Sequence, residues 1–333
     1  MTAADGVFTA QWTAPTIGLG TYYVHFRHQD GSVDKSYMAP GKIMVGTASV
    51  TQRIAGANRY ATAAEVARMF GTSEKVYLVS GEKFADSVAA GPLARQNKAP
   101  LLLTKPESLT PETASALSFL KAKEVVIVGG ELAVKPEVEA SLKALGLTVT
   151  RIAGATRYET SALVAASMKQ DGRFLVASGE SLADAMAAGS YGLPILLSPA
   201  KTLDPKVAAV LDGAAEVTLL GGEKVLDAAL PAQIKAGKVN RLAGTTRYET
   251  NVEILKHFAG TPEQVVLANG TSLADALTSA PLGLPVLLST DKALPAAAKT
   301  YLEASTARQV LILGGHLVIS TELETTIQSL LKN

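Results

Sequence analysis

An eight-residue motif occurs three times along the chain and constrains the fold more than any other feature. It reads RIAGANRY from Arg53, RIAGATRY from Arg151 and RLAGTTRY from Arg241. We call it the arginine box. Its copies lie far enough apart for each to open a unit the size of a small domain, rather than one turn of a solenoid. The sequence therefore predicts three related modules in tandem.

The residues that follow each box recur in one order. A segment [SN]-G-x-x-x-A-D comes first, then an apolar run led by proline, then a pair of glycines. The apolar runs are short, do not alternate and are bounded by Gly or Pro, which is typical of strands buried on both faces of a parallel sheet. Segments with helical periodicity separate them. We expect each unit to read β-α-β-α-β-α-β-α, with helices on both faces of its sheet.

The last residues set the expected phase of the repeat. The chain ends on a helix-like segment, TELETTIQSLLKN, and no fourth box precedes it. We therefore expect each module to start with its own box strand. The predicted modules span residues 48–147, 148–238 and 239–333.

Residues 1–47 differ from the repeats, and we expect a short β segment or the remnant of an upstream domain there. A turn is expected at Asp30-Gly31. The expected strands span residues 7–12, 21–27 and 35–38. The first ten residues lack the basic and apolar regions of a signal peptide, so we expect either that an export sequence has been removed or that the protein is cytosolic.

Helix-start signals fall where the repeat predicts helices. Thr62 and Thr250 are candidate N-caps, because Glu65 and Glu253 follow three residues later as in a capping box. Prolines suited to a first helical turn stand at Pro111, Pro136 and Pro205.

Composition excludes several classes of function. The chain has 31 basic and 30 acidic residues, so it lacks the basic surface of a nucleic-acid-binding protein. It has no cysteine, which excludes disulfides, thiolate metal sites and cysteine nucleophiles. It has no apolar run long enough to cross a membrane. We expect no nucleic acid partner and no membrane insertion.

Arginine is concentrated in the boxes. Six of the eleven arginines are the paired arginines of the three motifs, and elsewhere lysine is the commoner cation. A guanidinium can hold a carboxylate or a phosphate through two bonds, which lysine cannot. Three interpretations stay open: an ion pair inside each module, such as Arg59 with Asp86; a contact between modules; or direct contact with a ligand.

Three other recurrent residues have two interpretations each. The aspartates Asp86, Asp184 and Asp275 stand at expected helix starts, where they suit the helix dipole or contribute to a ligand site. The tyrosine after each box either packs in the module or stacks on a sugar, and we favour packing. The glycine pairs favour a tight turn, because neither a G-x-G-x-x-G nor a phosphate-binding loop occurs.

Catalysis finds little support in the sequence. The four histidines, His25, His28, His257 and His316, do not stand at equivalent positions of the three units. No nucleophile elbow G-x-S-x-G occurs, and no group of residues has metal-ligand spacing. We expect no enzyme activity, no cofactor and no metal.

Taken together, the motifs identify a family. The box R-[IL]-A-G-x-x-R-Y, the segment [SN]-G-x-x-x-A-D, the following P-[ILV]-L-L and the final [VL]-G-G resemble the cell-wall-binding type 2 repeats of clostridial surface-layer and cell-wall proteins. Such repeats also occur beside amidase domains in other Gram-positive bacteria. The resemblance covers residues 48–333. It departs mildly at Asn269, where the other units have Ser, and at Leu242, where they have Ile.

The resemblance implies three Rossmann-like α/β modules packed as a triangular pseudo-trimer. It also implies that a secreted protein is held non-covalently on the Gram-positive cell wall. The implied partner is an anionic wall polysaccharide or a teichoic-acid-like polymer, with an upstream effector domain as a further candidate. Two alternatives stay open: a structural or self-assembling scaffold, and an α/β enzyme acting on wall components.

The resemblance also suggests which residues contact the polymer or join the modules. The candidates are Arg53, Arg59, Tyr60, Arg151, Arg157, Tyr158, Arg241, Arg247 and Tyr248. Asp86, Asp184 and Asp275 are expected to support them.

Overall fold

The computed structural model describes residues 20–22, 43–45 and 50–331 and separates the chain into two units. One unit is Met1–Ala48 with Asn333, and the other is Ser49–Lys332, which we call the body. In the first unit, β1 (Gly20–Tyr22) pairs antiparallel with β2 (Ile43–Val45). β1 overlaps the start of the expected strand at 21–27, whereas the strands expected at 7–12 and 35–38 lie outside the described residues.

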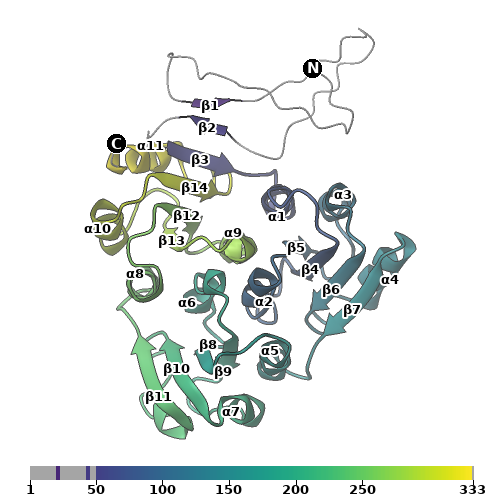
Figure 1. Ribbon diagram of the computed structural model, residues 1–333, viewed down its shortest axis with the longest axis vertical. Coiled ribbons are helices and arrows are strands. Elements are labelled where there is room, and N and C mark those ends of the chain that lie inside the picture. Colours follow the sequence, from purple (N-terminus) through teal and green to yellow (C-terminus); the bar gives the residue numbers. More distant parts are fainter. Residues whose placement is uncertain (1–19, 23–42, 46–49, 332–333) are drawn as a thin grey trace, which may run out of the picture. The chain divides into compact units, whose positions relative to one another are not determined.

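The body contains three four-stranded parallel sheets, one for each module (Figure 1). The first has the order β5 (Leu101–Thr104), β4 (Lys75–Ser80), β6 (Glu124–Val128), β7 (Thr148–Ile152). The second has the order β9 (Ile195–Ser198), β8 (Arg173–Ser178), β10 (Ala214–Leu220), β11 (Ala236–Leu242). The third has the order β13 (Val286–Ser289), β12 (Gln264–Asn269), β14 (Gln309–Leu313), β3 (Val50–Ile54).

Helices connect the strands of each sheet. The first repeat contains α1 (Arg59–Arg68), α2 (Ala90–Gln96), α3 (Pro111–Leu120) and α4 (Pro136–Ala144). The second contains α5 (Arg157–Ala166), α6 (Ala183–Met186), η1 (Gly189–Tyr191), α7 (Pro205–Leu211) and η2 (Leu230–Gln233). The third contains α8 (Arg247–Phe258), α9 (Leu273–Ser279), η3 (Ala280–Leu282), α10 (Ala296–Ala304) and α11 (Thr321–Leu330). The second repeat thus has only a short 3-10 turn where a fourth α-helix was expected.

Each box strand completes the sheet of the preceding module. β7 pairs with β6, and β11 pairs with β10. β3 precedes the first repeat in the sequence and pairs with β14 of the third. The expectation that a module starts with its own box strand is therefore wrong at the level of the sheets. A parallel crossover returns the chain beside the strand it has just left, so β7 lies beside β6 rather than beside a strand still to come.

Each box helix, in contrast, covers its own module. α1 packs against β5 and α3, α5 against β9 and α7, and α8 against β13 and α10. The residues between box strand and box helix therefore cross from one module to the next. The ranges 48–147, 148–238 and 239–333 describe the sequence repeat, and the sheets extend across them.

The box helices begin four residues earlier than the capping signals predicted. The N-caps are Asn58, Thr156 and Thr246. Thr62 and Thr250 lie inside the helices instead, where each hydroxyl accepts the N–H of the box glycine, at 3.1 and 3.0 Å. A capping box does occur in the third repeat, but it joins Thr246 and Glu249. The prediction for the prolines is confirmed, because Pro111, Pro136 and Pro205 are the first residues of their helices.

The three modules share one apolar core. Each has a smaller core on one face of its sheet, and a larger cluster draws buried residues from all three modules. At its centre Gly91, Gly189 and Ala280, which occupy equivalent positions, nearly touch. A Cβ on Gly91 would lie 2.9 Å from the Ala280 Cβ and 3.7 Å from the Gly189 Cα. The predicted α/β class and pseudo-threefold arrangement are thereby confirmed.

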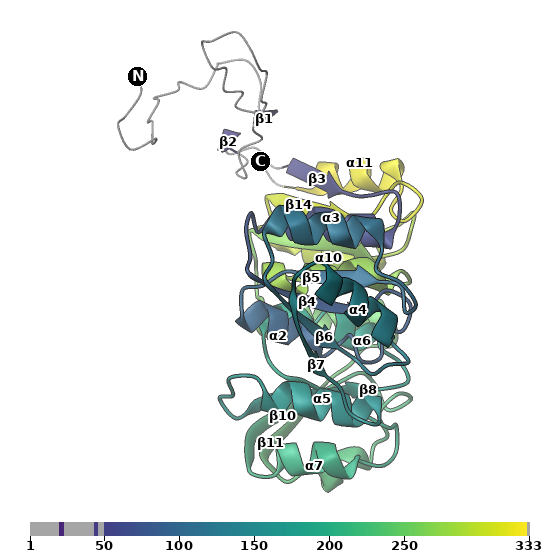
Figure 2. The ribbon, with the colours of Figure 1, turned by 90° about the vertical axis from the view of Figure 1, so that its right-hand side faces the viewer.

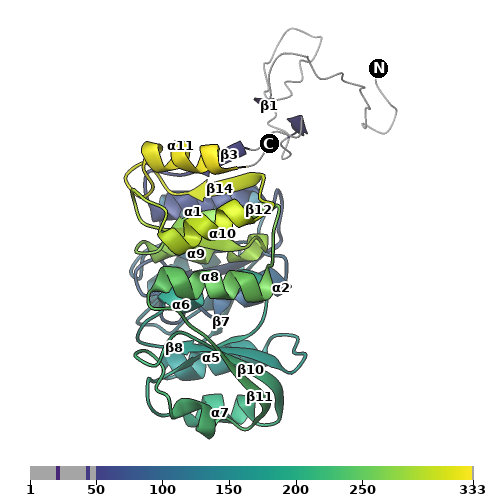
Figure 3. The same cartoon turned by 90° about the vertical axis from the view of Figure 1, so that its left-hand side faces the viewer.

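Helices of the three modules run in nearly the same direction. α1, α2, α5 and α8 are seen end-on in Figure 1 and lengthwise in Figure 3, and α2 and α5 are also seen lengthwise in Figure 2. A threefold rotation preserves direction along its axis. The carboxyl ends of the three sheets therefore face the same side of the body, and so do the box residues that lie there.

Candidate functional site

The first arginine of each box joins its strand to the preceding module. Arg53 donates from Nη1 to the Gly314 carbonyl at 2.7 Å, and from Nε and Nη2 to Glu324 Oε2 at 3.1 and 2.7 Å. Arg151 makes the equivalent contacts, with the Gly129 carbonyl at 2.7 Å and with Glu139 Oε2 at 3.1 Å. In both, the acidic partner belongs to the last helix of the preceding repeat.

Arg241 keeps this role although the second repeat lacks that helix. It donates to the carbonyls of Gly221, Leu226 and Asp227 at 2.9, 2.8 and 3.1 Å. Backbone carbonyls thus replace the missing carboxylate. All three first arginines thus make contacts between modules. This was one of the interpretations that the sequence left open.

The second arginine of each box bonds within its own module. Arg59 donates from Nη1 to the Gly81 carbonyl at 2.6 Å, and Arg247 donates to the Gly270 carbonyl at 2.7 Å. Arg157 makes the same bond to Gly179. In each case one arm of the fork meets the end of the first strand of the module. The Arg59 guanidinium also lies 5.8 Å from the centre of the Phe84 ring, a cation–π contact.

Each of the three aspartates lies at the point where the strand order of its sheet reverses. The strand order of the first module is β5-β4-β6-β7, so connections leave β4 and β6 toward opposite sides. Open α/β sheets hold ligands in the crevice at such a point, outside the carboxyl ends of the strands. Asp86 follows β4, and a Cβ on Gly129, the residue after β6, would lie 3.3 Å from the Asp86 Oδ2. Gly221 and Gly314 meet Asp184 and Asp275 in the same way, at 2.7 and 3.0 Å.

These glycines cannot be replaced freely. Gly129, Gly221 and Gly314 have φ angles of 126, 114 and 105 degrees, a region that side chains rarely adopt. The glycine pair therefore provides a left-handed turn and leaves space for the aspartate. A further turn separates it from the next helix, so it is not a direct strand-to-helix turn.

Two of the second arginines act electrostatically on the aspartate of the preceding module. Burial raises the pKa of Asp275 to about 6, and the guanidinium of Arg59 opposes this rise. Burial also raises the pKa of Asp184, opposed by Arg247 and by a hydrogen bond from Thr250. The anticipated ion pair between Arg59 and Asp86 is absent from the described part of the chain. Arg59 stands instead on α1, which packs against α9, the helix of Asp275, because the box crosses from one module to the next.

The aspartate of the first module is more exposed than those of the other two. Asp86 is partly exposed, whereas Asp184 and Asp275 are 8% and 4% exposed. Asp86 lies in the turn before α2 and accepts the N–H of Gly130 at 3.4 Å. Asp184 and Asp275 lie in the first turns of α6 and α9. One Asp184 oxygen is buried without a hydrogen-bond partner.

The box tyrosines pack against the glycine that their neighbouring arginine binds. A Cβ on Gly81 would lie 2.5 Å from the Tyr60 ring, and the same holds for Gly179 and Tyr158. For Gly270 and Tyr248 the distance is 2.7 Å. Tyr60 is 7% exposed, and its hydroxyl bonds to Glu82 at 3.1 Å. The geometry favours packing over sugar stacking.

Two further kinds of polar side chain recur at this edge, a Ser or Asn at the strand end and a lysine in a loop. The hydroxyls of Ser80 and Ser178 and the side-chain oxygen of Asn269 all accept backbone N–H groups of the next turn, so Asn269 replaces Ser without loss of this role. Sequence reasoning missed a second feature, an exposed lysine after the strand that follows the proline. These lysines are Lys105, Lys201 and Lys292. The signal was available, because each repeat has a lysine in that loop.

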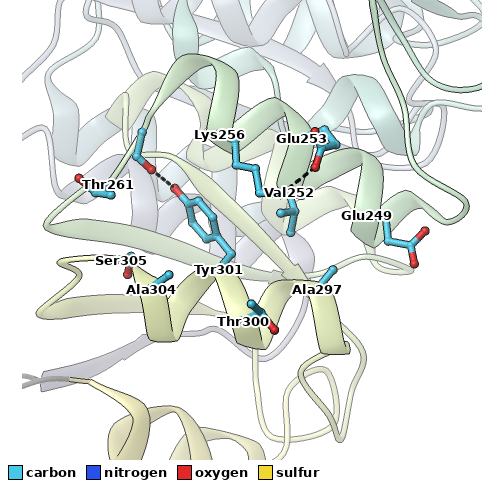
Figure 4. Close-up of a pocket in the computed structure, with 11 residues that line it drawn as sticks. Glu249, Val252, Glu253, Lys256, Thr261, Ala297, Thr300, Tyr301, Ala304 and Ser305 are labelled. Carbon is cyan, nitrogen blue, oxygen red and sulfur yellow. Dashed lines mark hydrogen bonds and ion pairs between the residues drawn. The ribbon is translucent and has the colours of Figure 1, made fainter.

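A groove outside the boxes occurs in the third module. Figure 4 shows it between α8 and α10, with a volume of about 410 Å³ and with Lys256, Tyr301 and Ser305 in its lining. The Tyr301 hydroxyl donates to the Gly260 carbonyl at 2.9 Å. In the first repeat the matching space is bridged, because Asn58 bonds to Glu112 at 2.8 Å and Arg68 lies over Phe119. The first and third repeats therefore differ here.

The part of the chain that the structure describes has neither a cluster of metal ligands nor a membrane-spanning helix. No group of three or more His, Asp or Glu side chains could hold a metal ion there. None of the helices described has the length and apolar character needed to cross a membrane.

Comparison with known proteins agrees with the threefold geometry. The family described as cell wall binding domain 2 (CWB2) matches at residues 53–139, 151–230 and 241–324. The chain belongs to the CWB2 family. As a member with three CWB2 domains, it is similar in structure to Cwp6 from Clostridium difficile, with a TM-score of 0.81 and 26% identity over 94% of this chain and 51% of that one. Cwp8 from the same organism gives 0.77 and 29% over 85% and 52%.

Two curated relatives from Bacillus subtilis (strain 168) are similar in sequence. The N-acetylmuramoyl-L-alanine amidase LytC is 29% identical over 289 residues, 84% of this chain and 58% of the relative. The amidase enhancer is 31% identical over 296 residues, 86% of this chain and 41% of the relative. The chain thus spans about half the length of these relatives. CWB2 domains imply a component of the cell wall as the partner and a location at the cell surface.

Proposed function

We propose that this CWB2 protein holds a secreted protein on the cell wall by binding an anionic wall polymer, and that it does so without catalysis. The carrying observation is the threefold recurrence, at the carboxyl edge of each sheet, of a second box arginine bonded to a glycine carbonyl and of an aspartate packed against a glycine pair. These three edges face one side of the body, so one extended polymer can contact several of them. Weak sites joined in this way gain affinity from effective concentration.

The second arginines are the best candidates for polymer contact. The first arginines spend two or three donors on protein partners, whereas the second ones each donate once, to a glycine carbonyl. Their remaining N–H groups can bind a phosphate or carboxylate at the seam. Lys105, Lys201 and Lys292 would add exposed positive charge at the same edge.

The aspartates do not oppose this proposal. Asp184 and Asp275 are almost fully buried, and each lies near the second arginine of the next module. They orient that arginine and balance its charge, while the lysines remain exposed to solvent. We assign no catalytic step to these carboxyl groups, since the three repeats place no shared nucleophile beside them.

Sedimentation with isolated Gram-positive cell walls tests the proposal. The protein should pellet with intact walls and much less with walls whose secondary polymers have been extracted. Replacing Arg59, Arg157 and Arg247 together by Lys keeps one donor for the glycine carbonyl but removes the fork, so binding should fall at least tenfold with little change in melting temperature. The matched control replaces Arg68, Arg173 and Arg308, which lie outside the boxes, by Lys.

Two results would contradict the proposal. Equal pelleting with extracted walls would exclude the anionic polymer as the ligand. A large drop in melting temperature of the triple box variant, with wall binding unchanged in its folded fraction, would assign the second arginines a purely structural role.

A further inference from the structure

No short connection joins β3 to the strand with which it pairs. β7 is joined to β6 through residues 129–147, and β11 is joined to β10 through residues 221–235. These connections keep each strand beside its partner. β3 ends at Ile54, whereas its partner β14 begins at Gln309. Only non-covalent contacts therefore close the third sheet, and we call β3 the closing strand.

Polar contacts account for most of what holds the closing strand. Its five residues pair in register with Gln309–Leu313. The Val50 N–H donates to the Arg308 carbonyl at 2.8 Å, and the Gly314 N–H donates to the Ile54 carbonyl at 3.0 Å. Of the five side chains only that of Ile54 is buried. A segment with few buried apolar contacts opens at a lower free energy than the rest of a domain.

Removal of the closing strand would leave an edge that fits a box strand. β14 would expose unpaired N–H and C=O groups, which readily pair with another strand. Beside it, the Gly314 carbonyl and Glu324 would be left without the guanidinium of Arg53. A strand that restores both needs an arginine at the position of Arg53 in the pairing register. All three box strands have one, but β7 and β11 are held in their own sheets by short connections, so β3 of a second copy is the strand available to supply it.

We propose that β3 exchanges between copies, so that the closing strand of one chain completes the third module of another. The exchanged contacts are identical to those within one chain, so exchange conserves them and costs mainly the entropy of association. Residues 55–58 would act as the hinge. Because the chain links β3 directly to α1, β3 closes the third module of its own chain when the protein is dilute. A high protein concentration favours exchange. This inference is independent of polymer binding.

The absence of native cysteine makes a disulfide test direct. Two single variants, Val50→Cys and Gln309→Cys, place the cysteines at paired register positions of β3 and β14. Mixed, refolded together at high concentration and then oxidised, they should give a disulfide-linked dimer on a non-reducing denaturing gel. The same mixture refolded when dilute should give little. The control mixture, Glu124→Cys with Thr148→Cys, marks the matching pair of β6 and β7, which the chain holds together.

The dimer should form at least five times more in the β3 mixture than in the control mixture. Equal yields in the two mixtures, or no dimer at high concentration, would overturn the proposal. If circular dichroism shows that either variant fails to fold, the next register pair, Thr51→Cys with Val310→Cys, provides the same measurement.

Discussion

Arg59 and Asp275 belong to the first and third repeats, yet the guanidinium of one lies close enough to oppose the rise in the pKa of the other. The pair joins the two ends of the body, because β3 completes the third sheet and α1 covers the first. Arg247 and Asp184 have the same relationship between the third and second repeats. The arginine box is therefore a connector between modules as well as a candidate binding element.

The buried carboxyl of Asp275 should make stability depend on pH. Its pKa of about 6 in the folded chain exceeds the ordinary aspartate value of 3.8, so folding favours the protonated form. This contribution to stability is fully present below pH 4 and is lost as the pH rises through 6. Relative to the wild type, Asp275→Asn should gain up to about 3 kcal/mol in unfolding free energy between pH 4 and pH 7. Denaturant unfolding at several pH values measures this.

The variant Asp184→Asn should show a change of the same sign, because burial raises the pKa of that carboxyl as well. A difference between wild type and Asp275→Asn that stays constant with pH would contradict the prediction.

The contact between Arg53 and Glu324 should stabilise the closed body. Their side chains are 13% and 24% exposed, and two hydrogen bonds join them. A double-mutant cycle with Arg53→Ala and Glu324→Ala should give a coupling of about 1–2 kcal/mol, as for partly buried charge-assisted bonds.

The exposed pair Lys123 and Glu74, at 72% and 74% exposure, serves as the control for this cycle. Its coupling should be a few tenths of a kcal/mol or less. Equal coupling for the two pairs would mean that the Arg53 contact contributes no more than an ordinary surface ion pair.

The centre of the shared core should tolerate only one methyl group. Gly91→Ala adds a Cβ at 2.9 Å from that of Ala280, so it should destabilise the body by about 1–3 kcal/mol. The double variant Gly91→Ala with Ala280→Gly moves the methyl group to an equivalent place and should recover most of this loss. Thermal unfolding of both variants provides the measurement. Failure of the second substitution to rescue the first would show that the three helices do not meet as described.

Wall retention should weaken with salt. Contacts between arginines and a charged polymer are screened as ionic strength rises. The bound fraction should fall between 0.05 and 0.5 M NaCl, a range over which the Debye length shortens from about 14 to about 4 Å. The variant with Lys at positions 59, 157 and 247 should bind less at low salt while keeping a similar salt slope, because its charge is unchanged. Retention that does not respond to salt would favour apolar or purely steric attachment.

The local features of the fold were predictable from the sequence. The buried strands, the helices that start at Pro111, Pro136 and Pro205, and the recurrence of the whole unit all follow from periodicity and turn chemistry, which act over a few residues. The two arginines were recognisable as special for the same reason, because guanidinium is used there and lysine elsewhere. Family resemblance then supplied the arrangement of the modules.

Which distant residues become neighbours was decided by the tertiary structure. Nothing in the sequence near Arg53 or Arg59 indicates that Glu324 and Asp275 are their neighbours, because those contacts span most of the chain. These contacts depend on the sheet edge that each box strand joins. Because a parallel crossover returns the chain beside the strand it has just left, that edge belongs to the preceding module. The sequence thus determined three copies of one unit, and the threefold packing decided that each copy is completed by the next.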